Sequence, residues 1–225
     1  MSEEPVVLDR VEGVCGELVL RQVGDDFEII ANGVFIMDTR NGRSERLMVA
    51  AVADRMPPGR LLVGGLGVGF SLRAALDHPR VSEVVVVERE DAVIAWNRGP
   101  LKSRHGDALA DPRARCVAVD LLTWLPASGE RFAGICLDID NGPDWTVTEG
   151  NAALYVDAGL DMLAGALEPG GVLAVWSAGV SSAFAARLAA RFGPVETLSV
   201  PVPRGEPDLV FVTRVPLIAS KSPTR

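Results

Sequence analysis

The first part of the chain consists of short apolar runs separated by polar turns. The runs lie at residues 6–8, 17–20, 27–30 and 34–37. Between the last two runs, Asn32-Gly33 is a strong signal for a two-residue hairpin, because both residue types tolerate the left-handed backbone of such a turn. The pattern therefore predicts a small antiparallel β-hairpin unit over residues 1–42.

Beyond residue 58 the pattern becomes one of buried strands that alternate with helices. Apolar runs lie at residues 61–63, 84–88, 116–119, 135–138 and 172–175. They lack the alternation of apolar and polar positions that half-exposed strands show, so we expect helices to cover both of their faces. Two final runs, 195–200 and 209–213, are expected to pair antiparallel. The predicted fold is α/β, with a doubly wound, mostly parallel sheet of seven strands.

Three helices are predicted most clearly, over residues 43–56, 152–167 and 181–192. Each one stops at a proline or at a glycine and proline together, which cannot continue a helix. We divide the chain into the β-hairpin unit at 1–42, an α/β domain over 43–216 and a loose tail at 217–225.

The composition excludes several classes of partner. Against 22 Lys and Arg there are 30 Asp and Glu, giving a net charge of −8, which is the wrong sign for gripping the phosphate backbone of nucleic acids. We expect neither a signal peptide nor a membrane span. The three cysteines are too dispersed for a disulfide framework, so the expected setting is a reducing cytoplasm.

Neither histidine belongs to a cluster with metal-ligand spacing. We expect His78 and His105 to be solvated loop residues, and we expect no metal site.

The strongest chemical signal is a glycine-rich loop directly after a predicted strand, in 61-LLVGGLGVGF-70. Gly65, Gly67 and Gly69 would let the backbone turn sharply and approach a ligand closely. Glu88 follows at the end of the next predicted strand, roughly 20 residues on, where an acidic side chain reaches ribose hydroxyls. The combination indicates a nucleoside-bearing small molecule, although the glycines alone would also fit a plain tight turn.

The loop does not fit the two common nucleotide motifs. A dinucleotide fingerprint needs a glycine or alanine at its sixth position, where this chain has Phe70 or Leu72, depending on which glycine begins the motif. No phosphate-binding Gly-Lys-Ser/Thr sequence is present. These differences disfavour NAD and ATP as ligands.

Taken together, these features resemble the spermidine synthase family of aminopropyltransferases, within the class I S-adenosylmethionine-dependent methyltransferase fold. The resemblance covers nearly the whole chain. Its residues are the Glu45 helix, the glycine loop, His78-Pro79, Glu88, and strands that end in Asp120 and Asp138. It implies a Rossmann-like domain over 43–216 that binds S-adenosylmethionine or its decarboxylated form as co-substrate, without a metal.

The resemblance also implies roles for individual residues. Gly65, Gly67 and Gly69 would line the methionine or aminopropyl part of the donor, and Glu88 would bind both ribose hydroxyls. Asp120 and Leu121 would hold the adenine.

Asp138, in 135-ICLDIDNGP-143, falls where the family has its catalytic base. The chemistry needs such a group, because an ammonium must lose a proton before its nitrogen can attack a carbon activated by a sulfonium. The alternative reading makes Asp138 a helix cap or a loop carboxylate, with Asp140 as the second candidate for the base.

Three positions depart from the family pattern. The loop aspartate of the family is replaced by Val68, its second acceptor-site aspartate by Asn141, and a tyrosine two residues before the helix glutamate by Arg43. Losing buried charge partners weakens binding by several powers of ten, so efficient transfer to putrescine is not expected. Arg43 would instead suit a carboxylate, on an acidic acceptor or on intact S-adenosylmethionine.

The candidate acceptor pocket consists of Arg43, Glu45, Asn141 and Trp145, although Glu45 would also fit a surface position and Trp145 a packing role. The sequence favours a transferase that moves a methyl or alkylamine group to an unknown small-molecule acceptor. Two alternatives remain: a polyamine aminopropyltransferase acting on an atypical amine, and a nucleoside-binding protein without catalysis. The hairpin unit suggests a homodimer.

Overall fold

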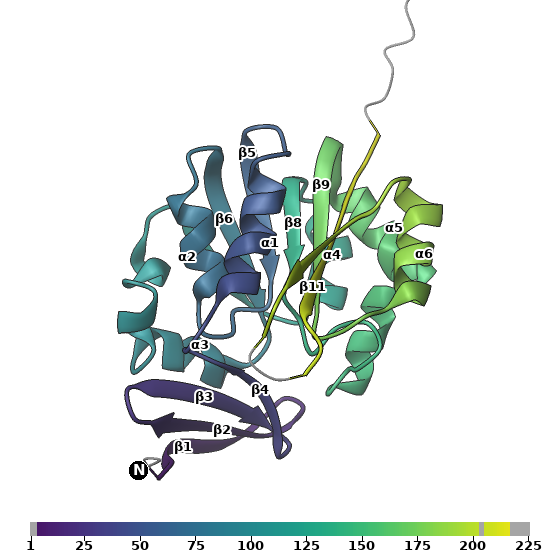
Figure 1. Ribbon diagram of the computed structural model, residues 1–225. Coiled ribbons are helices and arrows are strands. Elements are labelled where there is room, and N and C mark those ends of the chain that lie inside the picture. The colour runs from purple at the N-terminus through teal and green to yellow at the C-terminus, as the bar shows by residue number, and fades with distance from the viewer. Residues whose placement is uncertain (1–3, 203–204, 217–225) are drawn as a thin grey trace, which may run out of the picture.

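The chain forms two sheets, a small one at the N-terminus and a large one flanked by helices (Figure 1). They are seen in a computed structural model that describes residues 4–202 and 205–216. The predicted tail at 217–225 lies outside the described residues.

The N-terminal sheet has four antiparallel strands in sequence order, as the hairpin pattern predicts. They are β1 (Val6–Gly13), β2 (Gly16–Val23), β3 (Asp26–Ala31) and β4 (Val34–Asp38). At the turn between β3 and β4, Asn32 has φ 51° and Gly33 has φ 76°. Both values are left-handed, which is the backbone that a tight two-residue hairpin requires.

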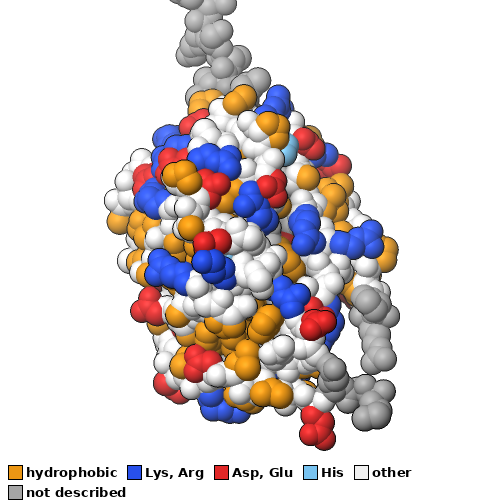
Figure 2. Space-filling view, turned by 90° about the vertical axis from the view of Figure 1, so that its left-hand side faces the viewer, with side chains coloured by type: hydrophobic (Ala, Val, Ile, Leu, Met, Phe, Trp, Pro, Cys, Tyr) orange, Lys and Arg blue, Asp and Glu red, His pale blue; other side chains and the backbone are white. Residues whose placement is uncertain are grey.

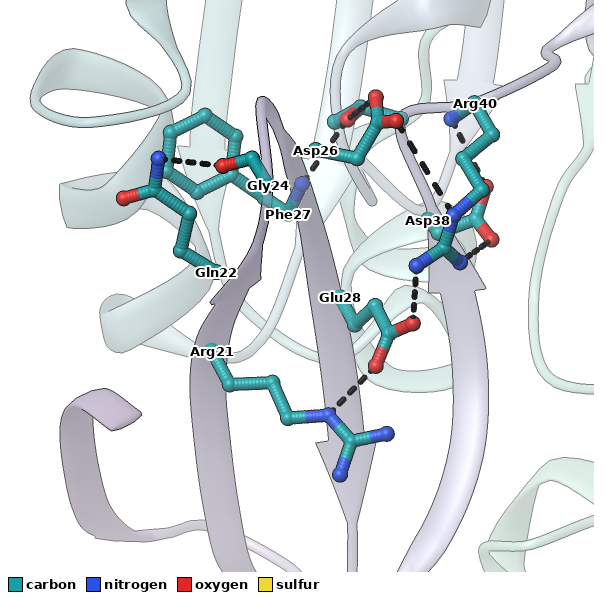
Figure 3. A network of polar contacts seen from close by, with 9 residues as sticks. Arg21, Gln22, Gly24, Asp26, Phe27, Glu28, Asp38 and Arg40 are labelled. Atoms are coloured by element: carbon teal, nitrogen blue, oxygen red, sulfur yellow. Dashed lines mark hydrogen bonds and ion pairs between the residues drawn. The ribbon is translucent and has the colours of Figure 1, made fainter. Parts of the chain in front are cut away.

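A polar network fixes the end of this sheet where the chain leaves for the first helix (Figure 3). Glu28 on β3 accepts hydrogen bonds from Arg21 on β2 and from Arg40, which follows β4. Arg40 also pairs with Asp38. Burial opposes ionisation of Glu28, but the two arginine hydrogen bonds outweigh it and lower the pKa of its carboxyl. The network thereby holds the segment that leads into the helix carrying Ser44 and Glu45.

The large sheet has seven strands in the order β10-β11-β9-β8-β5-β6-β7. Its central pairs are parallel, and β11 runs antiparallel to both of its neighbours, β9 and β10. This confirms the predicted α/β fold with a mostly parallel sheet. The strands are β5 (Gly59–Gly64), β6 (Val81–Glu88), β7 (Ala114–Ala118), β8 (Phe132–Leu137), β9 (Leu167–Ser177), β10 (Glu196–Val200) and β11 (Asp208–Arg214).

Helices cover both faces of this sheet (Figure 1), which explains why its strands are apolar throughout. On β5, Leu61 and Val63 join the core beneath α1, α2 and α3, while Leu62 points into the core beneath α4, α5 and α6. The helices are α1 (Arg43–Ala53), α2 (Phe70–Asp77), α3 (Asp91–Arg98), α4 (Leu121–Ser128), α5 (Asp157–Ala166) and α6 (Ser182–Phe192). None of the described helices is both long enough and apolar enough to span a bilayer.

One predicted helix is divided. The region expected to be helical over 152–167 forms a 3-10 segment, Glu149–Tyr155, followed by α5, and Leu167 already belongs to β9. Val156 between them is extended, with φ −95° and ψ 170°. The break lets the Tyr155 hydroxyl donate to the carbonyl oxygen of Ile139, at 2.8 Å. Tertiary packing therefore overrides the local helical pattern here.

The strand order reverses between β5 and β8, which lie side by side although a large part of the chain separates them. The connections that follow these two strands leave in different directions, so a crevice opens beyond their carboxyl ends.

Candidate functional site

The glycine-rich loop lies in this crevice, between the end of β5 and the start of α2. Gly65 has φ +90°, and a Cβ there would stand 2.2 Å from the carbonyl oxygen of Asp138. Only glycine fits, because neither the backbone angle nor the neighbouring β8 loop leaves room for a side chain. The loop and the β8 end are thus held in direct contact.

A cavity of about 190 Å³ lies beyond the loop. It is lined by residues from the ends of several parallel strands and from the N-terminal sheet. They include Ile36, Met37, Glu45, Gly65, Gly67, Glu88, Arg89, Glu90, Asp120, Leu121, Asp138, Asp140, Asn151 and Trp176. Gly69 is not among the lining residues; it precedes α2 with φ +86°.

Glu88, at the end of β6, braces the loop and faces the cavity. Its two carboxylate oxygens accept the backbone N–H of Leu66, at 3.0 Å, and of Glu90, at 2.9 Å. Burial raises the pKa of this carboxyl, and the two backbone hydrogen bonds partly oppose the rise. Each carboxylate oxygen has a second lone pair, so hydroxyl donors of a ligand can still be bound.

Asp120 and Leu121 line the cavity where α4 begins. Asp120 caps this helix by accepting the N–H of Leu122, at 2.8 Å, and it also contacts Arg89 across 3.4 Å. Arg89 lies 3.8 Å from Glu90 as well. The one arginine of the lining is therefore already paired with acidic neighbours.

Asp138 follows β8 and accepts a hydrogen bond of 2.7 Å from the hydroxyl of Ser71, in the first turn of α2. It caps no helix. Burial, followed by the negative charge of Glu45, raises the pKa of Asp138 to about 7, while the Ser71 hydrogen bond opposes the rise. A carboxylate with such a pKa takes up a proton near neutral pH, as a general base must.

Two further carboxylates lie close to Asp138. Ser44, in the first turn of α1, contacts Glu45 Oε2 at 3.0 Å and Asp208 Oδ2 at 2.8 Å. Burial raises the pKa of Glu45, with a contribution from the charge of Asp208, and burial also raises the pKa of Asp208. The charges of both residues raise the pKa of Asp138. The three groups therefore form one electrostatic cluster.

Asp140, the second candidate for the base, holds the loop after β8 through hydrogen bonds to its carboxylate. It has φ 62°, and its carboxylate accepts the backbone N–H of Val147 and of Thr148 together with the side-chain N–H of Asn151. These contacts fold residues 140–151 over the cavity. Of the two aspartates, Asp138 is the one whose carboxylate keeps capacity for a ligand.

A second cavity, of about 730 Å³, lies between the N-terminal sheet and the starts of α1 and β11. Glu45 and Trp176 line both cavities. Asn141, which is buried, and Trp145, which is 58% exposed, line the second one. Arg43 is exposed and lines neither.

Sequence reasoning missed part of this arrangement. Asp208 carries no local signal, because only the pairing of β11 with β9 brings it to Ser44. Ser71 carries no local signal either, because its contact with Asp138 joins α2 to the end of β8. His105, expected to be solvated, is 1% exposed and packs against Gly69. The expectation was wrong because its ring nitrogens are satisfied internally, by the Asn97 carbonyl and the Ala108 N–H.

The strand order and the glycine loop define a methyltransferase-like α/β fold. Two spermidine synthases are among the solved structures that share it. A spermidine synthase in complex with the transition-state analogue AdoDATO superposes with a TM-score of 0.81 at 17% identity, over 92% of this chain and 73% of that one. The spermidine synthase of Thermotoga maritima gives 0.75 at 17% identity, over 92% and 72%.

The chain also has relatives by sequence, and these are polyamine aminopropyltransferases. The chain is 31% identical to the polyamine aminopropyltransferase of Mycobacterium tuberculosis over 179 residues, which are 76% of this chain and 32% of that one. It is 30% identical to polyamine aminopropyltransferase 1 of Hyperthermus butylicus over 159 residues, 68% of this chain and 52% of that one. No family model matches. The chain is a distant homologue of the polyamine aminopropyltransferases, and it spans about a third of the mycobacterial relative's length.

Proposed function

We propose that the chain transfers an alkylamine group from decarboxylated S-adenosylmethionine to an amine acceptor, with Asp138 as the base. The observation that carries this proposal is the charge of the first cavity. Its lining contains six acidic side chains and a single arginine, Arg89, which is paired with Asp120 and Glu90. A cavity so charged favours a ligand with positive groups and opposes one with a free carboxylate.

The donor fits the residues that are present. Its ribose hydroxyls would donate to Glu88, and its adenine would lie beside Asp120 and Leu121. Gly65 lines the cavity without a side chain, next to Asp138. Intact S-adenosylmethionine carries a carboxylate that would meet Glu45 and Asp138, and Arg43 lines neither cavity to offset it. This argues against methyl transfer.

The transfer itself needs one proton acceptor and one leaving group. Asp138 takes a proton from the acceptor's ammonium, which leaves a neutral amine with a free electron pair. The amine nitrogen then bonds to the carbon attached to the sulfonium, and the carbon–sulfur bond breaks with its electron pair going to sulfur. The products are the alkylated ammonium and a neutral thioether, methylthioadenosine. Asp138 releases its proton to solvent.

Parallel calorimetric titrations with the decarboxylated and the intact donor test this proposal, together with an assay for methylthioadenosine release in the presence of amines. We expect at least about tenfold tighter binding of the decarboxylated form, because an unpaired carboxylate in an acidic cavity costs more than 1.4 kcal/mol. Tighter binding of the intact donor would indicate methyl transfer. Donor binding without release of methylthioadenosine would indicate a nucleoside-binding protein, and no binding of either donor would refute the cavity assignment.

We also propose a homodimer formed through the N-terminal sheet. Both of its edge strands carry exposed apolar side chains, among them Val6 and Val7 on β1 and Phe35 on β4. Hydrophobic side chains also gather on the lower part of the face in Figure 2, at the level of this sheet. Exposed edges of this kind favour pairing with a second copy. Sedimentation that shows only monomers at micromolar concentration would exclude the dimer.

A further inference from the structure

Asn97, near the end of α3, is tied to the glycine-rich loop although it is distant from the loop in sequence. Its side-chain Nδ2 donates to the carbonyl oxygen of Gly67 at 2.7 Å and to that of Val93 at 2.9 Å. Both partners are carbonyl oxygens, which can only accept, so the orientation of the amide is fixed. The residue is fully buried, and its Oδ1 has no hydrogen-bond partner among the described residues. Within the described part of the chain, the amide is therefore held by its N–H groups alone.

The Gly67 carbonyl belongs to the central peptide of a tight turn. The N–H of Gly69 donates to the carbonyl oxygen of Leu66 at 2.9 Å and closes this turn. Gly67 has φ +50°, whereas the φ of Val68 is not positive. Turn types that share the closing hydrogen bond differ mainly in the orientation of the central peptide, which takes no part in that bond. The hydrogen bond from Asn97 fixes this orientation.

The same peptide lies at the wall of the first cavity. Gly67 lines this cavity together with Gly65 and Glu88. Met37 on β4 packs directly against Gly67, since a Cβ there would stand 2.3 Å from the Met37 Sδ. The backbone of Gly67 thus forms this part of the wall, and its orientation decides which backbone groups a ligand meets.

His105 holds the backbone of Asn97 in place. Its Nδ1 accepts the N–H of Ala108 at 3.0 Å, so the ring proton is on Nε2, which lies 3.2 Å from the Asn97 carbonyl oxygen. The last carbonyls of a helix lack partners within that helix, and His105 supplies one here. Burial lowers the pKa of His105, so the ring stays neutral and keeps this arrangement at neutral pH. Asn97 is therefore fixed at its backbone and reaches the loop through its side chain.

We propose that Asn97 is a positioning residue for the donor, because its hydrogen bond keeps the peptide between Gly67 and Val68 in the orientation that binds. This deepens the proposed function and rests on it, since the donor would lie along the loop in the first cavity. The role needs a hydrogen-bond donor at Asn97 and not merely a buried side chain. Without that donor, only part of the population has the binding-competent loop, and the apparent affinity falls by that fraction.

The test titrates methylthioadenosine calorimetrically into the full chain and its variants, between about pH 5 and 8, and compares each Kd with that of the wild type at the same pH. Asn97→Ala removes the hydrogen-bond donor and should weaken binding about tenfold at every pH. Asn97→Asp keeps the size of the side chain, and burial favours the protonated form of the new carboxyl. The ionised form has no hydrogen to donate, whereas the protonated form can donate to Gly67 again. We expect Asn97→Asp to bind at least about tenfold more weakly at about pH 8 and to approach the wild type as the pH falls.

Ile94→Ala is the control for a general loss of stability. Ile94 is buried on the same helix and lines neither cavity, so its truncation should lower the free energy of unfolding and leave the Kd unchanged. Three outcomes overturn the proposal: wild-type affinity in Asn97→Ala, equal weakening in Ile94→Ala, or weakening in Asn97→Asp that does not change with pH. If Asn97→Asp does not fold, the comparison of Asn97→Ala with Ile94→Ala decides.

Hydrogen exchange separates this proposal from the proposed function. The N–H of Gly69 closes the turn, and it should exchange faster in Asn97→Ala than in the wild type or in Ile94→Ala, with or without ligand. Equal exchange in the two variants would also overturn the role of Asn97. A wild type that binds no methylthioadenosine, or releases none from the decarboxylated donor, would instead refute the proposed function.

Discussion

Ser71 in the first turn of α2 donates its hydroxyl hydrogen to Oδ2 of Asp138 at the end of β8, across 2.7 Å. The two residues are distant in sequence, and the parallel pairing of β5 with β8 brings them together. Ser71 itself is 2% exposed, so the hydroxyl cannot turn to bulk water instead. The relationship makes Ser71 a positioning residue that stabilises the ionised form of the proposed base.

Replacing Ser71 by alanine should therefore raise the pKa of Asp138 further. Because the rate depends on the ionised carboxylate, the acidic limb of the kcat/KM profile should move to higher pH, by about one unit for a charged hydrogen bond of roughly 1.5 kcal/mol. Ser82→Ala is the control, because Ser82 is exposed on β6. A limb that stays in place in Ser71→Ala would show that this hydrogen bond does not tune the base.

Asp138→Asn should abolish transfer while it increases stability at neutral pH. The folded-state pKa of about 7 lies above that of an unfolded aspartate, so between about pH 4 and 7 the unfolded state binds fewer protons. The free energy of unfolding of the wild type therefore falls as pH rises through this window. The free energy of unfolding of the asparagine variant does not fall in this way, because asparagine does not ionise. We expect an advantage on the order of 4 kcal/mol at pH 8 that disappears below pH 4. Urea unfolding at several pH values measures it, and an equal stability at pH 8 would contradict the raised pKa.

Glu88→Gln should weaken donor binding. The neutral side chain has one accepting oxygen where Glu88 uses two for the N–H groups of Leu66 and Glu90. Losing charge-assisted hydrogen bonds worth roughly 1.5–3 kcal/mol corresponds to about ten- to hundredfold in Kd. Calorimetry with methylthioadenosine measures this change. Glu83→Gln, on the same strand but paired with Arg60 at the protein surface, should leave the Kd unchanged.

Asp140→Ala should loosen the loop over the first cavity. The variant leaves the N–H groups of Val147 and Thr148 without their acceptor. We expect faster hydrogen exchange at these two amides and a loss of stability of roughly 1–3 kcal/mol. Asp144→Ala, at an exposed position of the same loop, should exchange like the wild type. Unchanged protection in Asp140→Ala would mean that other contacts hold the loop.

Much of the fold could be predicted because its signals are local. The hairpin at Asn32-Gly33 follows from two residues that tolerate left-handed angles, and the buried strands follow from continuous apolar runs. The helix predicted over 152–167 was interrupted because Tyr155 satisfies its hydroxyl on Ile139, a contact that no local pattern contains.

The candidate site likewise contains some residues that the sequence could place and others that it could not. Glu88 and Asp138 could be placed from the sequence, because carboxyl ends of neighbouring parallel strands meet at one edge of a sheet. Asp208 could not, since it begins the strand that β9 and β10 enclose on either side, and its approach to Ser44 depends on that pairing. His105 was misjudged for the same reason: its surroundings come from the glycine loop and α3.

The sequence by itself therefore determined the α/β class, the hairpin unit, the glycine loop and the acidic ends of the central strands, all of which arise from the conformational preferences and polarity of neighbouring residues. Only the tertiary structure decided which carboxylates share a cavity. It brought Glu45 from α1, Asp138 from β8 and Asp208 from β11 into one cluster, which raises the pKa of Asp138. Electrostatic coupling of this kind depends on the distance between the charges and on their burial. Neither quantity can be predicted from the order of residues along the chain.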